Sequence, residues 1–418
     1  MNILIIGINY HPELTGIGPY TAELAEHLAE RGDMVTVITG LPHYPGWRIA
    51  AGTRRSLVSE ERLNGVRVIR AAHFVPARQD ALRRGAYEAT FGLTGLLAST
   101  RPDRPDAIVG VVPSLSGGVL TRLLAARFKS AYGLLFQDLM GPAAQQSGMA
   151  GGSAVARATT AVERWAVARA AAVGIVSASF GPYIASLGIR SELIVDVPNW
   201  TRLASTDLSP ASTRQMFGWG DGEQIVLHAG NIGLKQGLHQ IVDAARVSML
   251  RDEPVRFVLS GSGSQAAEIQ AAAEGLRNVE FLGLQSERMH ANLLRAADVL
   301  LLSERPSQVD MSLPSKLTAY YAAGRPIVAA VGVGGASAAE IERSRAGIVV
   351  AAGQPDSLLD ALAQLRSEPA VAEALGVAGC RYAEETTSSR ACLARAATFV
   401  DVIASGSRRA AAPIRVAA

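Results

Sequence analysis

The chain has 418 residues, of which 49% are hydrophobic and 18% charged, and its formal net charge is +3. This is the composition of a globular chain, and its length exceeds what one hydrophobic core usually supports, so we expect two domains of roughly 200 residues. No run of 18 apolar residues and no basic leader occurs, so we expect neither a membrane span nor a secretion signal. The two cysteines, Cys380 and Cys392, lack metal-type spacing and fit a reducing cytoplasm.

Positive charge is concentrated between Arg48 and Arg104, a stretch with 11 arginines and five carboxylates. An amphipathic segment, residues 81–99, lies within it. Two interpretations remain open: residues 78–104 lie on an anionic membrane surface, or solvated arginines cover an ordinary core helix. We expect no nucleic-acid partner, because no interleaving of aromatic and basic residues accompanies the charge. The expected location is cytoplasmic, and the first interpretation adds peripheral contact with the inner face of the cell membrane.

The first 200 residues alternate short apolar runs with helical patterns, which indicates a parallel sheet covered by helices on both faces. We expect strands over residues 2–8, 34–39, 66–71, 107–112, 133–136, 173–176 and 193–197. The segment "VPNWTR" then breaks the pattern, and a polar stretch follows up to Gly222. We place the domain boundary there, with residues 1–200 as the first domain.

The first strand leads into "YHPELTGIGPYT", whose glycines Gly16 and Gly18 precede a helix that begins near Pro19. A dinucleotide fingerprint requires a third glycine and a carboxylate after the next strand. The third position here is Thr21 and no such carboxylate follows, so a nicotinamide dehydrogenase is the weakest interpretation. The two glycines instead let a ligand phosphate approach a helix N-terminus, or form an ordinary strand-to-helix turn.

The second half repeats the alternation and predicts another doubly wound domain over residues 201–385. We expect its strands over residues 224–229, 255–260, 279–283, 299–303 and 325–331. A helix should follow Pro355, and another should cover residues 389–405. We expect residues 386–405 to form a C-terminal helix that packs back on the first domain, and residues 406–418 to be a disordered tail.

An ordered series of motifs resembles glycosyltransferase family 4: the N-terminal glycine loop, "VPNW", "HAGNIGLKQGL", "VLSGSGS", "VEFLG", "LLRAADVLLLS" and "LPSKLTAYYAAGRPIVAA". The versions "NYHPELTGIG", "GNIGLKQG" and "LPSKL" look most like the subgroup associated with colanic acid and other exopolysaccharide assembly. The resemblance implies the α/β GT-B fold, with two doubly wound Rossmann-like domains facing a central cleft. It also implies a transferase that uses a nucleotide-diphosphate sugar as donor.

The leaving group of such a donor is a diphosphate, so the site must stabilise negative charge on the leaving oxygens. No D-x-D motif occurs in the chain. We therefore expect no metal and no cofactor beyond the co-substrate, and cations and helix N-termini must supply the stabilisation. Lys235 in "GNIGLKQG" and Lys316 in "LPSKL" are the predicted catalytic cations, although a solvated lysine at a helix start remains the alternative for Lys235.

The family resemblance assigns donor binding to the loops after the strands, and the predicted residues are Gly16, Gly18, Gly230, Asn231, Gly261, Gly263, Leu284, Glu304, Leu313 and Ser315. Asn231 stands where the family usually has an arginine. Met311 and Ala319 stand where many members have two glutamates, and Glu304 is a candidate substitute for them. Structural alternatives remain open for some of these residues: a tight turn for Gly261 and Gly263, core packing for Leu284, and a plain helix N-cap for Ser315.

In "LLFQDLMG", Gln137 and Asp138 are candidates to position the donor sugar or the acceptor hydroxyl, and Asp138 would otherwise cap the following segment. His228 and His239 are expected to be packing residues. We predict a retaining, metal-independent glycosyltransferase acting on a glycan or lipid-linked acceptor in cell-surface polysaccharide or glycolipid assembly. In such enzymes the leaving phosphate is thought to take the acceptor proton, so no strong protein base is needed. The alternatives are a sugar-nucleotide 2-epimerase of the same fold and a non-catalytic nucleotide-sugar-binding protein.

Overall fold

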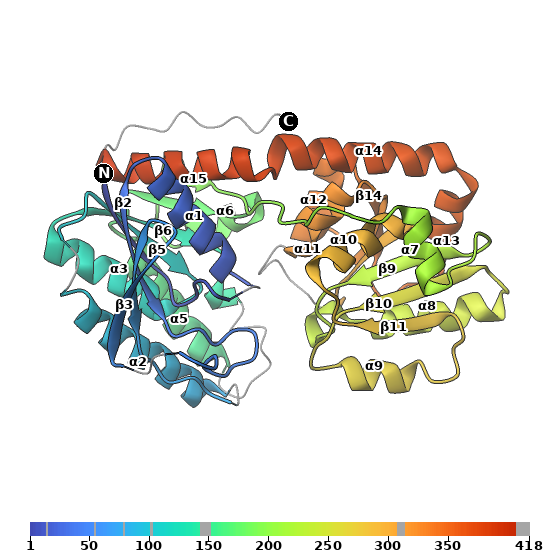
Figure 1. Cartoon of the computed structure of the whole chain (residues 1–418), viewed down its shortest axis with the longest axis horizontal. Coiled ribbons are helices and arrows are strands. Elements are labelled where there is room, and N and C mark those ends of the chain that lie inside the picture. Colours follow the sequence, from blue (N-terminus) through green and yellow to red (C-terminus); the bar gives the residue numbers. More distant parts are fainter. Residues whose placement is uncertain are drawn as a thin grey trace. The chain divides into compact units, whose positions relative to one another are not determined.

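The computed structural model describes residues 1–13, 16–53, 56–77, 80–100, 103–142, 152–306 and 314–406. The chain divides into two compact units (Figure 1). Unit 1 contains Met1–Pro198 together with the chain from Cys392 onward, and unit 2 contains Asn199–Ala391. Each unit is built on one sheet with helices on both of its faces, which confirms the predicted α/β class.

The sheet of unit 1 has eight strands in the order β3-β4-β2-β1-β5-β6-β7-β8. Neighbouring strands run parallel, except that β3 pairs antiparallel with β4 at one edge. The strands are β1 (Asn2–Ile6), β2 (Met34–Gly40), β3 (Val58–Leu63), β4 (Val66–Ala71), β5 (Ala107–Val112), β6 (Ala131–Phe136), β7 (Ala172–Ile175) and β8 (Ile194–Asp196).

Strand β3 is missing from the sequence-based prediction because of its composition. Its residues, VSEERL, are half-buried or exposed, so it lacks the apolar run that marks the central strands. A two-residue turn, Asn64-Gly65, joins it to β4 with φ values of +47° and +82°. Asn-Gly is the pair that tight hairpin turns favour, so this dipeptide was the available indication of the hairpin.

Helices cover both faces of this sheet. The helices α2, α3, α5 and α6 pack on one face, where they share a core with alternate residues of the strands. On the other face, Phe399 of helix α15 lies against Gly174, and a Cβ at Gly133 would overlap Ile403 of the same helix. The helices and 3₁₀ turns of unit 1 are α1 (Gly18–Glu30), α2 (Ala81–Ala98), α3 (Leu115–Phe128), α5 (Gly152–Val167), η1 (Ala178–Phe180), α6 (Gly181–Ser186), η2 (Ser191–Leu193) and α15 (Ser389–Ala404).

The sheet of unit 2 has six parallel strands in the order β11-β10-β9-β12-β13-β14. They are β9 (Gln224–Ala229), β10 (Val255–Ser260), β11 (Val279–Gly283), β12 (Val299–Ser303), β13 (Ile327–Val331) and β14 (Gly347–Ala351). One face packs mainly against α10, α11 and α12, and the other against α8, α9 and α13. The helices and 3₁₀ turn are α7 (Pro210–Phe217), η3 (Leu234–Gln236), α8 (His239–Leu250), α9 (Ala266–Ala272), α10 (Glu287–Ala296), α11 (Lys316–Ala323), α12 (Ala336–Ser344), α13 (Pro355–Ser367) and α14 (Pro369–Thr386).

Helix α14 is another element that the sequence analysis does not predict, and strand β14 and helices α7 and α12 are also absent from it. The buried positions of α14 are Gly376, Gly379 and Ala383, so this helix has no stripe of large apolar residues. Small residues are needed there because a Cβ at Gly376 would overlap the Gly324 carbonyl oxygen at the end of α11. Within the described residues, none of the helices is both long and apolar enough to cross a membrane.

Both sheets have a point at which the strand order reverses. In unit 1 it lies between β1 and β5, and in unit 2 between β9 and β12. The connections leaving the carboxyl ends of the two strands diverge there, which opens a crevice where open α/β sheets bind ligands. The topology therefore provides each unit with one favoured place for a site.

Candidate active site

In unit 2, the loops that follow β9 and β10 meet at the carboxyl edge of the sheet. Gly230 adopts a φ of +134° and Gly261 a φ of +142°. A Cβ at Gly261 would overlap the Gly230 carbonyl oxygen, and a Cβ at Gly263 would overlap the Ile232 carbonyl oxygen. Close packing of one loop on the other thus requires glycine at both positions. Contact of these glycines with a nucleotide stays a prediction.

Lys316, the first residue of α11, reaches back to strand β9. Its Nζ lies 3.1 Å from Nε2 of His228, and Nδ1 of His228 lies 3.3 Å from the Leu301 carbonyl oxygen. Nε2 also lies 3.5 Å from the Asn231 carbonyl oxygen. In the tautomer with the proton on Nδ1, the ring donates to Leu301 and accepts from the lysine at Nε2. Nζ is also beside Gly230, where a Cβ would be 3.3 Å away. Reading His228 as a packing residue is incomplete, because this fully buried ring also holds Lys316 at the point where the strand order reverses.

Desolvation dominates the electrostatics of this cluster. Burial lowers the pKa of the Lys316 ammonium to about 7, and Glu304 acts in the opposite direction. Burial, followed by the charge of Lys316, lowers the pKa of His228 well below its usual range and also lowers the pKa of His290. Both imidazoles are neutral at pH 7, whereas Lys316 is divided between amine and ammonium. An anion beside Lys316 would stabilise the ammonium.

Lys235 lies exposed on the 3₁₀ turn η3, directly after this cluster in the chain. Its carbonyl oxygen accepts a hydrogen bond from the Arg305 backbone N–H at 3.0 Å, which ties the loop after β9 to the chain after β12. Glu304 precedes that contact, and its Oε1 accepts from Ser337 Oγ at 2.8 Å. Three predicted residues, Lys235, Lys316 and Glu304, therefore come from segments that meet at one edge of the sheet.

The remaining predicted donor residues differ in how the structure treats them. Leu284 is 81% exposed, which rules out the core-packing alternative. Ser315 is the N-cap residue of α11, but its side chain makes no capping hydrogen bond and is exposed, so it is not a plain N-cap. Asn231 is exposed, and its Nδ2 donates to Gln236 Oε1 at 3.4 Å. Leu313 lies outside the described residues.

Unit 1 contains a cavity of about 210 Å³ where its own strand order reverses. Two predicted residues, Gly16 and Asp138, line it, while Gly18 begins helix α1 beside it. Its walls are mostly aromatic and charged, and the other lining residues are Ile8, Asn9, Ile17, His43, Tyr44, Trp47, Arg84, Tyr87, Glu88, Pro113 and Ser114. The Arg84 guanidinium lies 5.0 Å from the centre of the Trp47 ring. Aromatic faces and carboxylates are groups that can stack on sugar rings and accept from their hydroxyls.

Two carboxylates that shape this cavity were missed by the sequence analysis. Glu13 is buried, and its Oε1 accepts from the backbone N–H groups of His43 at 2.9 Å and Tyr44 at 3.0 Å. Glu88 accepts from the hydroxyls of Ser114 and Ser116 at 2.9 and 2.5 Å. Each bond joins parts of the chain 26 or more residues apart. No local pattern in the sequence predicts such a contact. The only available indication was the glutamate in "HPEL", which is Glu13.

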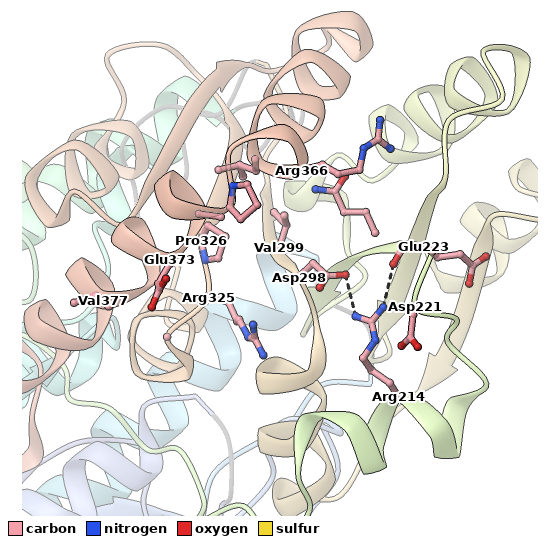
Figure 2. A pocket seen from close by; sticks show the side chains of 16 residues that line it. Arg214, Asp221, Glu223, Asp298, Val299, Arg325, Pro326, Arg366, Glu373 and Val377 are labelled. Atoms are coloured by element: carbon pink, nitrogen blue, oxygen red, sulfur yellow. Dashed lines mark hydrogen bonds and ion pairs between the residues drawn. The ribbon is translucent and has the colours of Figure 1, made fainter.

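A larger cavity of about 680 Å³ lies at the opposite, amino edge of the unit 2 sheet, near the starts of β9, β12 and β13 (Figure 2). None of the predicted site residues lines it. Arg214 is held there by Asp298 at 2.9 Å and by the carbonyl oxygens of Gly220 and Glu223, both at 3.0 Å. This guanidinium thus joins α7 to the ends of two strands, which is a structural role.

Two family models match the chain: "Glycosyl transferase 4-like domain" over residues 15–200 and "Glycosyl transferases group 1" over residues 223–368. The chain belongs to this glycosyltransferase family. It is a transferase with the GT-B fold. The first matched region begins after β1 and includes the other strands of the unit 1 sheet, and the second includes the whole unit 2 sheet from β9 to β14.

Among its relatives, the chain is 36% identical over 336 residues to the "Putative colanic acid biosynthesis glycosyl transferase WcaI" of Escherichia coli (strain K12). That alignment covers 78% of this chain and 82% of the relative. The D-rhamnosyltransferase WbpZ of Pseudomonas aeruginosa is 30% identical over 169 residues, covering 40% of this chain and 42% of WbpZ.

Solved structures share the fold at lower identity. Sucrose-phosphate synthase from Thermosynechococcus elongatus matches with a TM-score of 0.74 and 18% identity, over 97% of this chain and 100% of that one. Anabaena HepE, in a complex with UDP-glucose, matches with a TM-score of 0.67 and 16% identity, over 96% of this chain and 99% of that one. These likenesses establish the GT-B architecture.

Proposed function

We propose that this transferase is a retaining, metal-independent glycosyltransferase that moves a sugar from a nucleotide-diphosphate sugar to a glycan or lipid-linked acceptor in cell-surface polysaccharide assembly. The observation that carries the proposal is the Lys316–His228 pair at the reversal point of the unit 2 sheet. The name of the E. coli relative, which refers to colanic acid biosynthesis, supports the polysaccharide context. The complex of HepE with UDP-glucose supports a nucleotide-sugar donor.

The distribution of lysine supports donor binding at this edge. The chain has 40 basic side chains, and three of them are lysines: Lys129, Lys235 and Lys316. Lys235 lies on the 3₁₀ turn after β9, and Lys316 is the first residue of α11, which follows β12 in the chain. An ammonium is a compact charge on a flexible stem and, unlike a guanidinium, changes protonation readily when desolvated. We assign Lys235 and Lys316 to the diphosphate, and the N-terminus of α11 adds its dipole.

The proposed reaction needs no strong protein base. The bond between the sugar C1 and the diphosphate oxygen breaks, and the oxygen keeps the electron pair. The acceptor hydroxyl oxygen bonds to C1 on the same face, and its proton passes to the leaving phosphate. Lys235 and Lys316 stabilise the charge that develops on that phosphate. Metal independence is proposed because the chain has no D-x-D motif.

We assign the acceptor to the unit 1 cavity and the donor to unit 2, with residues 1–200 and 201–385 as the functional domains. Asp138 and Glu88 are placed to accept hydrogen bonds from acceptor hydroxyls, because both line that cavity. Gly16 and Gly18 are proposed to approach the donor phosphate. A location in the cytoplasm, at the inner face of the cell membrane, with residues 78–104 in contact with anionic lipid, completes the proposal.

A thermal-shift screen against GDP, UDP, ADP, NAD and the common sugar conjugates, without metal, tests the donor site. A ligand at 100 times its dissociation constant stabilises a protein by about 2.7 kcal/mol. We expect one nucleotide diphosphate series to raise the melting temperature, and Lys235→Ala and Lys316→Met to weaken the effect. Lys129→Ala is the matched control, since this exposed lysine lies in unit 1 at the end of α3. A response to NAD alone, or to no nucleotide, refutes the proposal.

The stereochemistry is tested by NMR of the anomeric configuration in the product. Incubation of the donor without acceptor, followed by chromatography of the sugar nucleotide, distinguishes transfer from 2-epimerisation. Conversion into an epimeric sugar nucleotide without release of nucleoside diphosphate contradicts the transferase mechanism given above.

A further inference from the structure

The helices α2, α3 and α5 of unit 1 lie next to one another (Figure 1). Each of them also has exposed large apolar side chains. We call this surface, the exposed residues of α2, α3 and α5, the helical face. Its large apolar members and their exposed fractions are Leu82 88%, Leu93 66%, Leu96 37%, Leu97 52%, Leu123 42%, Val155 40% and Trp165 40%. Single exposed leucines are normal, but such a group on adjacent helices indicates an interaction surface.

Helix α2 is apolar on two opposite sides. Tyr87, Phe91 and Ala98 belong to the core of unit 1. Leu82, Ala86, Ala89, Leu93 and Leu97 are exposed and follow one another at intervals of three or four residues, which is a second stripe along the same helix. A helix that is hydrophobic around most of its circumference is normally buried, so the outer stripe requires a partner.

The charge of the helical face identifies that partner as anionic. The three helices contain six arginines: Arg83, Arg84, Arg122, Arg127, Arg157 and Arg164. They contain only two carboxylates, Glu88 and Glu163, and both are engaged inside the unit. Glu163 is 2% exposed and accepts from Tyr183 Oη at 2.5 Å. Glu88 accepts from two serine hydroxyls beside the unit 1 cavity. Arg83 pairs with Asp80, the N-cap residue of α2, and Arg84 stacks on Trp47 in the unit 1 cavity. The positive charge of the helical face therefore comes from Arg122, Arg127, Arg157 and Arg164.

A cavity of about 920 Å³ continues the helical face beyond the carboxyl ends of α3 and α5. Arg122, Arg169 and Arg190 line it, and none of its lining residues is acidic. Arg190 pairs with Glu192 at 3.0 Å, so Arg122 and Arg169 supply the positive charge of the cavity. Arg122 also stacks on Trp165, with its guanidinium 4.1 Å from the ring centre. Tryptophan and arginine both combine an apolar body with a polar end, which suits the boundary between lipid and water.

We propose that the helical face docks on an anionic membrane, with its leucines and Trp165 in the acyl boundary and its arginines on lipid phosphates. The cavity of Arg122, Arg169 and Arg190 then receives a phosphate headgroup. This inference names the membrane partner of the proposed function and extends it from α2 to α3 and α5, yet it does not depend on the donor site. A second copy of the chain is a poorer partner, because two such faces would bring Arg122, Arg127, Arg157 and Arg164 of both copies together. Nucleic acid is also a poorer partner, since it offers nothing to the leucine stripe.

Co-sedimentation of the full chain with vesicles tests the proposal. The vesicles contain phosphatidylcholine alone or phosphatidylcholine with phosphatidylglycerol. We expect at least tenfold more protein bound to the anionic vesicles, and release at about 0.5 M salt, where charges are strongly screened. Equal binding to both kinds of vesicle, or to neither, overturns the proposal.

Two double variants separate the apolar and charged contributions. L93Q/L97Q removes part of the leucine stripe, and R127E/R164E reverses two exposed arginines. Each should reduce binding to anionic vesicles at least tenfold. The matched controls in unit 2, L250Q and R246E, alter a leucine that is 84% exposed and an exposed arginine and should bind as the unaltered chain does. If the variants and the controls lose vesicle binding to the same extent, the helical face is not the specific site of membrane binding.

Light scattering without lipid identifies self-association as the rival outcome. A dimer that L93Q/L97Q dissociates, with no binding to anionic vesicles, overturns membrane docking. The donor-induced thermal shift is measured on the same variants, because a loss of vesicle binding with an intact shift separates this inference from the donor site. If a variant does not fold, the salt and lipid dependence of the unaltered chain still decides the question.

Discussion

The protonation of Lys316 predicts that donor affinity falls as the pH rises from 6 to 8. The pKa of Lys316 is lowered to about 7, with burial as the main cause. Below this value the side chain is an ammonium that pairs with the diphosphate, and above it a neutral amine that does not. Binding of the donor should therefore take up a proton near pH 7, since the anion raises the pKa of the neighbouring ammonium.

The size of the effect follows from the populations. A group with a pKa near 7 is roughly 90% protonated at pH 6 and roughly 10% at pH 8. If only the ammonium form binds, the apparent dissociation constant is the intrinsic constant divided by that fraction, so it rises about ninefold, or about 1.3 kcal/mol. His228 does not contribute to this change, because burial lowers its pKa well below its usual range and its imidazole stays neutral from pH 6 to 8.

Isothermal titration calorimetry measures both the apparent dissociation constant and the proton uptake, with the sugar nucleotide that the thermal screen identifies as ligand. The diphosphate of a sugar nucleotide has no protonation step in this range, so its own titration does not interfere. Repeating the titration in buffers of different ionisation enthalpy gives the number of protons taken up. Lys316→Met should bind weakly at every pH, and Lys316→Arg should lose the pH dependence. A dissociation constant that stays flat from pH 6 to 8 in the unaltered protein refutes the reasoning.

Three further predictions concern the loops and the amino edge. Gly261→Ala should reduce the free energy of unfolding, measured by urea denaturation, by more than about 2 kcal/mol, because the new Cβ meets the neighbouring loop at a positive φ. Gly222→Ala is the control and should be close to neutral, because no atom lies within 4 Å of the added Cβ. Glu13→Ala should cost about 1.5–3 kcal/mol by the same measurement, since two buried N–H groups lose their acceptor, and a change below 0.5 kcal/mol would contradict that role. Arg214→Ala should lower the melting temperature, because the salt bridge to Asp298 is lost. The donor dissociation constant should stay unchanged, because the cavity around Arg214 lies at the amino edge of the sheet. Weaker donor binding would mean that the two edges of the sheet are coupled.

The fold could be predicted wherever large apolar residues report the core. The central strands of both sheets are fully buried runs, and the sequence analysis finds them. Strand β3 and helix α14 fail that test for opposite reasons. The first is a charged edge strand with little to bury. The second is buried through Gly376, Gly379 and Ala383, whose contacts come from close backbone approach. Hydrophobic periodicity detects neither arrangement.

The candidate site divides in the same way. The sequence indicates Lys235, Lys316 and the glycines of the loops as site residues, because a turn or a helix start restricts which residues fit there. The sequence does not indicate that His228 is the partner of Lys316. His228 is 88 residues away in the chain, and it belongs to a strand whose residues are all buried.

The sequence by itself thus determined the class of protein, the two doubly wound sheets and the loops that follow their strands, because the motifs, the apolar runs and the turn residues that indicate them lie within short stretches of the chain. The tertiary structure alone decided that Lys316 meets His228, that Glu13 holds the loop at Tyr44, and that three arginine-bearing helices share one face. Desolvation and charge clustering depend on which distant segments come together. A property such as the lowered pKa of Lys316 therefore exists only after the chain has folded.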